Sequence, residues 1–255
     1  MARKIVIASG KGGVGKTTLT VRLGCYLASR GARVLVCDGD FGLNNVDLLL
    51  GVEGKATCDL VDVIEGRCRA KQALVRCKQS PNLWLLSSNR SEPERFVSAQ
   101  SLKIVLDALA PQFDFLLVDA PSGLSEGFHR AVSVSDEAIV VTTPEITAIR
   151  DADKTVSALK NYRLKRVELV VNRVRGEKLA KGEGITPKQI GELLRTPVVG
   201  VVPELCGLGE LSTPPHRSIS VLGKNLLTGE KKVYDAAKKY RGVFGGLRRL
   251  IKEFW

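Results

Sequence analysis

The sequence has little of what a metal-bound or disulfide-bonded protein needs. It contains six cysteines and two histidines in 255 residues, and no two cysteines form a C-x-x-C pair. Structural zinc sites and iron–sulfur clusters are usually built on such pairs. We therefore expect the cysteines to be reduced thiols that pack as small apolar groups.

Long apolar runs and linkers are also missing. No uncharged apolar run approaches the roughly 18 residues that a membrane-spanning helix needs. The apolar run Ile5–Ala8 behind the basic N-terminus is too short for a signal peptide. There is no internal repeat, low-complexity segment or Pro/Ser-rich linker. These absences predict a cytoplasmic protein with one folded domain.

The residues that are present suit a soluble α/β domain with a basic end. The sequence is 44% apolar and 26% charged, which is ordinary for a globular protein. The formal net charge is +12, and residues 231–255 alone carry eight Lys or Arg and two acids. A basic balance favours binding to nucleic acid or to an anionic membrane surface.

Short β-branched runs alternate with helical patterns along the chain. We expect buried strands at Ile5–Ser9, Val34–Asp38, Leu83–Ser87, Phe115–Asp119, Ala138–Thr142, Val167–Asn172 and Val198–Val202. We expect helices at Lys16–Arg30, Ala99–Leu109, Glu126–Val134, Ala148–Asn161 and Pro187–Leu194. Near-continuous apolar strands are typical of a parallel sheet covered on both faces. The pattern predicts a doubly wound α/β fold, whose ligands bind beyond the carboxyl ends of the strands.

A glycine-rich loop follows the first predicted strand and matches G-x-x-x-x-G-K-[ST]. Its residues are Gly10, Lys11, Gly12, Gly13, Val14, Gly15, Lys16, Thr17 and Thr18. Glycines let backbone N–H groups turn toward phosphate oxygens, and the helix behind the loop points its positive end at the anion. Lys16 is predicted to reach the β and γ phosphates, and Thr17 to bind Mg²⁺. The loop predicts binding and hydrolysis of a nucleoside triphosphate.

Three aspartates end two of the predicted strands. Asp119 closes the run Phe115–Asp119, at the position where P-loop enzymes hold Mg²⁺ directly or through water. Asp38 and Asp40 follow the second strand, and one of them could serve Mg²⁺ while the other orients the attacking water. Either acid alone could equally be a loop residue without a role.

Lys11 makes the loop resemble that of the deviant Walker A ATPases, which include the MinD and ParA families and the nitrogenase iron protein. Within that group the sequence is most similar to the MinD family. The matching stretches are Asp38–Asp47, Asp119–Gly123, Val141–Glu145, Arg150–Asp153 and Val171–Arg173. The stretch from Thr186 to Gly223 departs from the family pattern, and no cysteine lies between Asp119 and Val171, where the iron protein carries its cluster ligands.

The resemblance implies roles that spacing alone does not give. It implies ATP and Mg²⁺ as cofactors, and a homodimer in which Lys11 touches the other subunit's phosphates. Asp40 would orient the lytic water, with Lys11 and Lys16 as further catalytic residues. Mg²⁺ would be held by Thr17, Asp38 and Asp119, partly through water. Asn172, Pro203 and Glu204 would contact the base.

The last fifteen residues form a basic amphipathic pattern. Their apolar side chains cover an arc of roughly 140° on a helix, with charged side chains opposite. Such a helix is typical of an in-plane membrane anchor, although a final helix packed on the domain would also give this pattern. The predicted membrane contacts are Val243, Phe244, Leu247, Arg248, Arg249, Leu250, Ile251, Lys252, Phe254 and Trp255.

We therefore predict an ATPase domain over residues 1–240 and a membrane-targeting helix over 241–255. ATP would dimerise the protein, the dimer would bind anionic lipid on the cytoplasmic face of the cell membrane, and hydrolysis would release it. The resemblance implies a division inhibitor of the MinC type and a regulator of the MinE type, or a substitute, as partners, and no specific nucleic acid. The main alternative is a ParA-like ATPase that binds DNA non-specifically. A flagellar-number ATPase of the same superfamily is a third reading.

Overall fold

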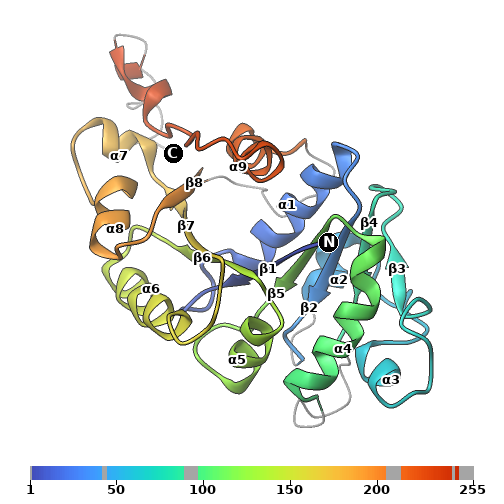
Figure 1. The fold of residues 1–255 in the computed structure, drawn as a ribbon. Coiled ribbons are helices and arrows are strands. Elements are labelled where there is room, and N and C mark those ends of the chain that lie inside the picture. Colours follow the sequence, from blue (N-terminus) through green and yellow to red (C-terminus); the bar gives the residue numbers. More distant parts are fainter. Residues whose placement is uncertain (1, 42–44, 89–96, 205–213, 243–244, 247–255) are drawn as a thin grey trace.

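The computed structural model describes residues 2–41, 45–88, 97–204, 214–242 and 245–246. Over these residues the strands are β1 (Arg3–Ala8), β2 (Val34–Asp38), β3 (Leu74–Arg76), β4 (Leu83–Leu86), β5 (Phe115–Asp119), β6 (Glu137–Thr142), β7 (Arg166–Val174) and β8 (Val198–Pro203). They form one sheet in the order β3-β4-β2-β5-β1-β6-β7-β8. Only β3 pairs antiparallel within this described sheet (Figure 1).

Helices cover both faces of the sheet. They are α1 (Lys16–Ser29), α2 (Asn45–Leu50), α3 (Leu60–Ile64), α4 (Ala99–Leu109), α5 (Glu126–Ser133), α6 (Ile146–Leu159), α7 (Gly176–Ala180), α8 (Pro187–Leu193) and α9 (Arg217–Thr228). Short 3₁₀ turns lie at Ala110–Gln112 (η2) and Lys238–Tyr240 (η3). In the described parts of the chain, no helix has the length and apolar character needed to cross a bilayer.

Two apolar cores lie on the two sides of the sheet because alternate residues of a strand face opposite ways. In β1, Ile5 and Ile7 belong to the core beneath α1, α2 and α9. Val6 and Ala8 belong to the core beneath α3, α4, α5, α6 and α8. The doubly wound α/β prediction is therefore confirmed.

The structure adds elements that the sequence patterns do not predict. β3 spans three residues, and α2, α3 and α7 span six or fewer, so they are too short to show a period. α9 has twelve residues and lies partly in the stretch from Thr186 to Gly223 that departs from the family pattern. Gly223 sits in the middle of this helix because a side chain there would clash with the Tyr26 ring of α1.

Some predicted residues lie outside the described part of the chain. They include positions 42–44 of the motif Asp38–Asp47 and all ten predicted membrane contacts. Those contacts are Val243, Phe244, Leu247, Arg248, Arg249, Leu250, Ile251, Lys252, Phe254 and Trp255.

Candidate nucleotide-binding site

In the loop between β1 and α1, neighbouring atoms leave no room for a side chain at Gly10 or Gly15. Gly15 has a φ of +88°, a left-handed conformation that side chains disfavour. The side chain of Asn172, at the end of β7, lies over it and donates from Nδ2 to the Val14 carbonyl at 2.7 Å. Gly10 lies directly against the Asp151 carbonyl of α6. The glycines and Asn172 thus set the shape of the loop.

Asp119 joins the loop to the neighbouring strand. Its Oδ2 accepts hydrogen bonds from Lys16 Nζ at 3.0 Å and from Thr17 Oγ1 at 2.7 Å. Its Oδ1 accepts from Thr20 Oγ1 at 2.8 Å. Lys16 and Asp119 are both buried, so this ion pair is shielded from water. Thr20 is a site residue that the motif did not predict, although it lies one helical turn beyond Lys16.

A cavity of about 430 Å³ opens over the loop. Asp40 lines it, and the Asp40 carbonyl accepts a hydrogen bond of 3.3 Å from Ser88 Oγ at the end of β4. The buried Ser9 hydroxyl, which also lines the cavity, has no hydrogen-bond partner among the described residues. The remaining lining residues are Gly12, Gly13, Gly15, Lys16, Thr17, Thr18, Asn45, Leu48, Leu49, Ser122 and Arg173. Six of the nine predicted loop residues therefore line one cavity, whereas Gly10, Lys11 and Val14 do not.

Asp38 and Asp119 are two buried carboxyl groups side by side. They are direct partners in the register of β2 and β5, and each is only 1% exposed. Burial, and then the nearby charge of Asp119, raise the pKa of Asp38 to about 7. The N–H groups of Asp40 and Val46 donate to Asp38 and oppose this rise in its pKa.

The buried carboxyl pair predicts a pH dependence of stability. In an unfolded chain the pKa of Asp38 returns to about 4. Between about pH 4 and pH 7 the folded state then holds more protons than the unfolded state, so the free energy of unfolding falls as the pH rises. We expect Asp38→Asn to remove this loss and to stabilise the nucleotide-free, Mg²⁺-free protein by up to roughly 4 kcal/mol at pH 8, with little effect near pH 4. Urea unfolding at pH 4.5, 6.5 and 8 measures the free energy of unfolding of the variant and of the parent protein.

The exposed Asp153 of α6 supplies the matched control for that experiment. Asp153→Asn should leave the pH profile of the unfolding free energy unchanged. Parallel profiles for Asp38→Asn and the parent protein would contradict the prediction.

The residues around the loop fit a magnesium ion held together with a nucleotide. Among the described residues no three His, Cys, Asp or Glu side chains gather into a metal cage. A Mg²⁺ ion at this place would therefore take ligands from phosphates and water, as is usual for nucleotide sites. The Thr17 hydroxyl and the adjacent carboxyls of Asp38 and Asp119 are the oxygen donors present. A cation would also relieve the repulsion that raises the pKa of Asp38.

Lys11 has its polar contacts outside the phosphate cavity of its own chain. Its Nζ donates to Glu145 Oε2 at 3.1 Å and to Thr147 Oγ1 at 3.1 Å, at the start of α6. Its side chain is 39% exposed, and it does not line the phosphate cavity. The two lysines of the loop therefore have different surroundings: Lys16 is buried against Asp119, and Lys11 is on the surface.

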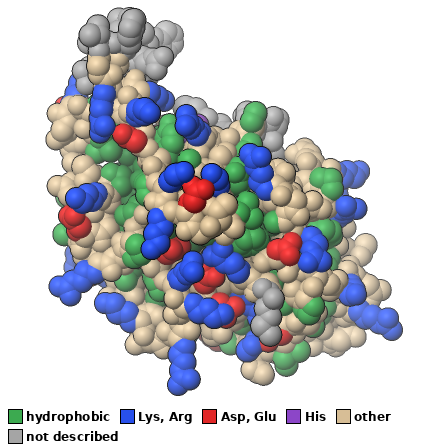
Figure 2. All heavy atoms as spheres, turned by 45° about the horizontal axis from the view of Figure 1, so that its top comes forward, with side chains coloured by type: hydrophobic (Ala, Val, Ile, Leu, Met, Phe, Trp, Pro, Cys, Tyr) green, Lys and Arg blue, Asp and Glu red, His purple; other side chains and the backbone are tan. Residues whose placement is uncertain are grey.

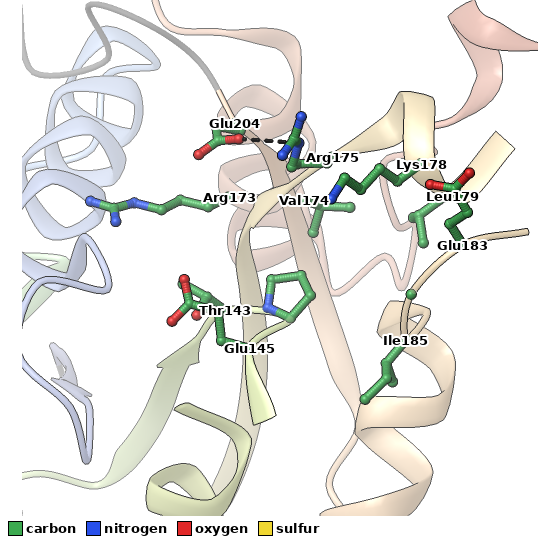
Figure 3. A pocket seen from close by; sticks show the side chains of 12 residues that line it. Thr143, Glu145, Arg173, Val174, Arg175, Lys178, Leu179, Glu183, Ile185 and Glu204 are labelled. Atoms are coloured by element: carbon green, nitrogen blue, oxygen red, sulfur yellow. Dashed lines mark ion pairs between the residues drawn. The ribbon is translucent and has the colours of Figure 1, made fainter. Parts of the chain in front are cut away.

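A second cavity, of about 370 Å³, has Arg173 among its lining residues (Figure 3). Arg173 lines both cavities and has a φ of +54°, which is strained for a residue with a side chain. Its neighbour along the chain, Asn172, was singled out from the sequence, but nothing in the sequence indicates the left-handed backbone at Arg173. The buried Thr143 hydroxyl lines the second cavity and has no partner in the described structure.

The three residues predicted to contact the base lie in different surroundings. Glu204 lines the second cavity, 3.7 Å from Arg175 Nε. Pro203 ends β8 and lines neither cavity. Asn172 is 5% exposed and uses its Nδ2 to hold the loop. Of the three residues, only Glu204 lines a cavity.

Taken with the parallel sheet, the loop and its partner Asp119 place the chain among the P-loop nucleoside triphosphatases. Residues 5–213 match the CobQ/CobB/MinD/ParA nucleotide binding domain. The septum site-determining protein MinD of Synechocystis sp. is 41% identical over 204 residues, which are 80% of this chain and 77% of that protein. The chain thus belongs to the CobQ/CobB/MinD/ParA family and, within it, to the MinD group of septum-site-determining ATPases.

Solved structures agree with this assignment. The MinC:MinD cell division protein complex of Aquifex aeolicus has a chain that is 34% identical, with a TM-score of 0.81 over 91% of this chain and 97% of that one. MinD of Pyrococcus horikoshii complexed with Mg-ADP is 30% identical, with a TM-score of 0.78 over 91% of this chain and 99% of that one. The protein is therefore an ATP hydrolase of the MinD group, which acts in the placement of the division site.

Proposed function

We propose that the protein is a membrane-cycling ATPase that forms a homodimer when it binds ATP. The observation that carries this proposal is the position of Lys11. A lysine in a phosphate-binding loop that does not line its own cavity, and that is held only by an exposed ion pair with Glu145 and a hydrogen bond to Thr147, can reach the phosphates of a second copy. Exposed ion pairs contribute little to stability, so Lys11 can leave Glu145 at small cost.

Within each copy, we propose that the loop and its neighbours hold the phosphates. The loop N–H groups and Lys16 bind the β and γ phosphate oxygens, while Thr17, Asp38 and Asp119 hold Mg²⁺, partly through water. Bound Mg²⁺ supplies charge neutralisation on the transferred phosphoryl group. When the nucleotide binds, the Lys16 ammonium group moves from the Asp119 carboxylate to the phosphate oxygens, so it keeps an anionic partner.

Asp40 is our candidate for the residue that orients the attacking water. It lines the phosphate cavity, and Ser88 holds its carbonyl. Because phosphoryl transfer depends mainly on positioning, we expect Asp40→Ala to bind ATP but to hydrolyse it at least about 100-fold more slowly. The variant should remain a dimer on vesicles after the parent protein has released. Single-turnover assays measure the rate, and normal turnover would exclude Asp40 from the mechanism.

We propose that the base lies beyond Arg173, toward the second cavity. Arg173 and Glu204 line that cavity, and the Asn172 side chain holds the loop through its hydrogen bond to the Val14 carbonyl. Pro203, at the end of β8, would limit the site on that side. In this arrangement Asn172 acts on the nucleotide mainly through the position of the loop, and Glu204 is the polar group for the base.

We also propose that the folded domain ends at Tyr240 and that residues 241–255 form a membrane-binding helix. Tyr240 is 5% exposed, whereas Arg241 is exposed, which supports a boundary between them. One short helix binds a membrane weakly, and two on a dimer bind much better through avidity. The dimer would sit on the cytoplasmic face of the cell membrane, recruit a division inhibitor of the MinC type, and respond to a regulator of the MinE type or a substitute.

Co-sedimentation with liposomes that contain anionic lipid tests the membrane cycle. We expect the full chain to pellet with ATP and to stay in solution with ADP, because only the dimer carries two tails. A chain ending at Arg241 should stay in solution with either nucleotide. Equal pelleting of both chains would contradict the role of the tail.

A further inference from the structure

The segment just before the tail is packed along the domain. After α9, the main chain of Lys232 exchanges two hydrogen bonds with the Asn225 side chain, at 2.5 and 3.3 Å. The Tyr234 ring then lies edge-on to His216, with 5.4 Å between the ring centres. Further along, Ala236 and the turn η3 pack against α7 so closely that Gly176 has no room for a side chain. The segment therefore runs from α9 to α7 as part of the fold (Figure 1).

The surface that α7 and this segment form together is strongly basic. Residues 175–183 and 224–242 contain nine Lys or Arg and four acids. Three of the acids are engaged in local ion pairs: Glu177 with Arg175 at 3.0 Å, Glu230 with Lys224 and Lys232 at 2.9 Å, and Asp235 with Arg241 at 3.1 Å. Figure 2, in which the top of Figure 1 is tilted toward the reader, shows Lys and Arg side chains spread across this side of the molecule.

Four lysines of this surface have no such partner. Lys178, Lys231, Lys238 and Lys239 are exposed, and among the described residues no carboxylate lies within ion-pair distance of them. Two apolar side chains accompany them, Leu227 at 39% and Val233 at 45% exposure. We call these six residues the tail-root surface.

We propose that the tail-root surface is a second membrane contact, which lies against anionic lipid headgroups when the tail is inserted. Only Arg241 and Gly242 separate the described segment Lys238–Tyr240 from the first predicted membrane residue, so an inserted tail brings these lysines to the headgroups. Each Lys near an anionic bilayer adds to binding, and the effect ends within a Debye length. The exposed side chains of Leu227 and Val233 favour a lipid interface, which has an apolar layer beneath its phosphates. The phosphate backbone of a nucleic acid has no such layer.

The proposal rests on the membrane cycle proposed above and is tested on the full chain with Mg-ATP. The variant Lys231→Glu, Lys238→Glu, Lys239→Glu reverses three charges of the surface. The matched control, Lys55→Glu, Lys71→Glu, Lys78→Glu, reverses three exposed lysines near β3, at the opposite edge of the sheet. Both are assayed on anionic vesicles of phosphatidylcholine and phosphatidylglycerol as the probe.

We expect the tail-root variant to lose at least about tenfold in vesicle affinity and to show a shallower dependence on salt, while the control loses less than about twofold. ATP binding and melting temperature should match the parent in both. Equal losses in the two variants, or no loss in the tail-root variant, would overturn this proposal alone. Failure of the parent chain to pellet would overturn the membrane cycle as well. If the tail-root variant lost binding to duplex DNA but kept its binding to vesicles, the surface would bind nucleic acid and the membrane-contact proposal would be overturned.

Discussion

Replacement of Lys16 by alanine is expected to abolish nucleotide binding and also to destabilise the fold. Lys16 is the buried partner of Asp119, and Asp119 already lies beside Asp38. Removing the lysine leaves two adjacent buried carboxyl groups without their cation. Breaking a buried ion pair by deleting one partner costs about 3–5 kcal/mol. Urea unfolding and titration with a fluorescent ATP analogue measure the two effects separately.

The double variant Lys16→Ala, Asp119→Asn serves as the control for this prediction. It removes the unpaired charge, so most of the lost stability should return, while nucleotide binding should stay absent. If Lys16→Ala unfolds at the same urea concentration as the parent, the ion pair is not important for stability. If it binds ATP normally, Lys16 is not a phosphate ligand.

Replacement of Lys11 by alanine is expected to leave stability and ATP binding unchanged, unlike replacement of Lys16, but to prevent dimer formation. The Lys11–Glu145 pair is exposed, so its loss should change the free energy of unfolding by less than about 1 kcal/mol. ATP should still bind, because Lys16 and the loop remain. Dimer formation with Mg-ATP should fail, since the lysine that reaches the partner's phosphates is gone. Analytical ultracentrifugation and an ATPase assay with vesicles measure both consequences.

Glu145→Gln separates the ion pair from the proposed contact between subunits. It frees Lys11 from its partner in the same chain but leaves its charge in place, so dimerisation should persist. An ATP-dependent dimer of Lys11→Ala as stable as that of the parent would contradict the role of Lys11 across the interface.

The sequence alone predicts much of the scaffold, because strands of a doubly wound sheet leave a clear apolar pattern. The predicted bounds of Val34–Asp38 and Phe115–Asp119 agree with β2 and β5, and the strand ends do bring Asp38 and Asp119 together. The antiparallel β3 is too short for any periodicity to reveal it. α9 was not predicted, since Gly223 in its middle is a weak helix former whose place depends on Tyr26.

In the site, too, some contacts follow from a local motif and others depend on residues that are far apart in the chain. The sequence predicts Thr17 and Asp119 at one Mg²⁺ site, and in the structure both Thr17 and Lys16 contact Asp119. The contact of Lys11 with Glu145 joins residues 134 positions apart, and that of Asn172 with Val14 joins residues 158 apart. No spacing rule covers such pairs, because they depend on how the strands are ordered in the sheet. The catalytic and binding roles given to these residues stay predictions.

The position of β1 in the middle of the sheet also constrains how the protein is made. Both neighbours of β1 come much later in the chain, since Arg3 pairs with Phe115 and Ile5 with Glu137. During synthesis the glycine loop therefore leaves the ribosome long before the strands that flank it. Non-local parallel pairings of this kind form slowly and leave apolar strands exposed in the meantime. Asn172 of β7 holds the loop and Arg173 lines the cavity, so a nascent chain completes the phosphate cavity only after β7 has emerged.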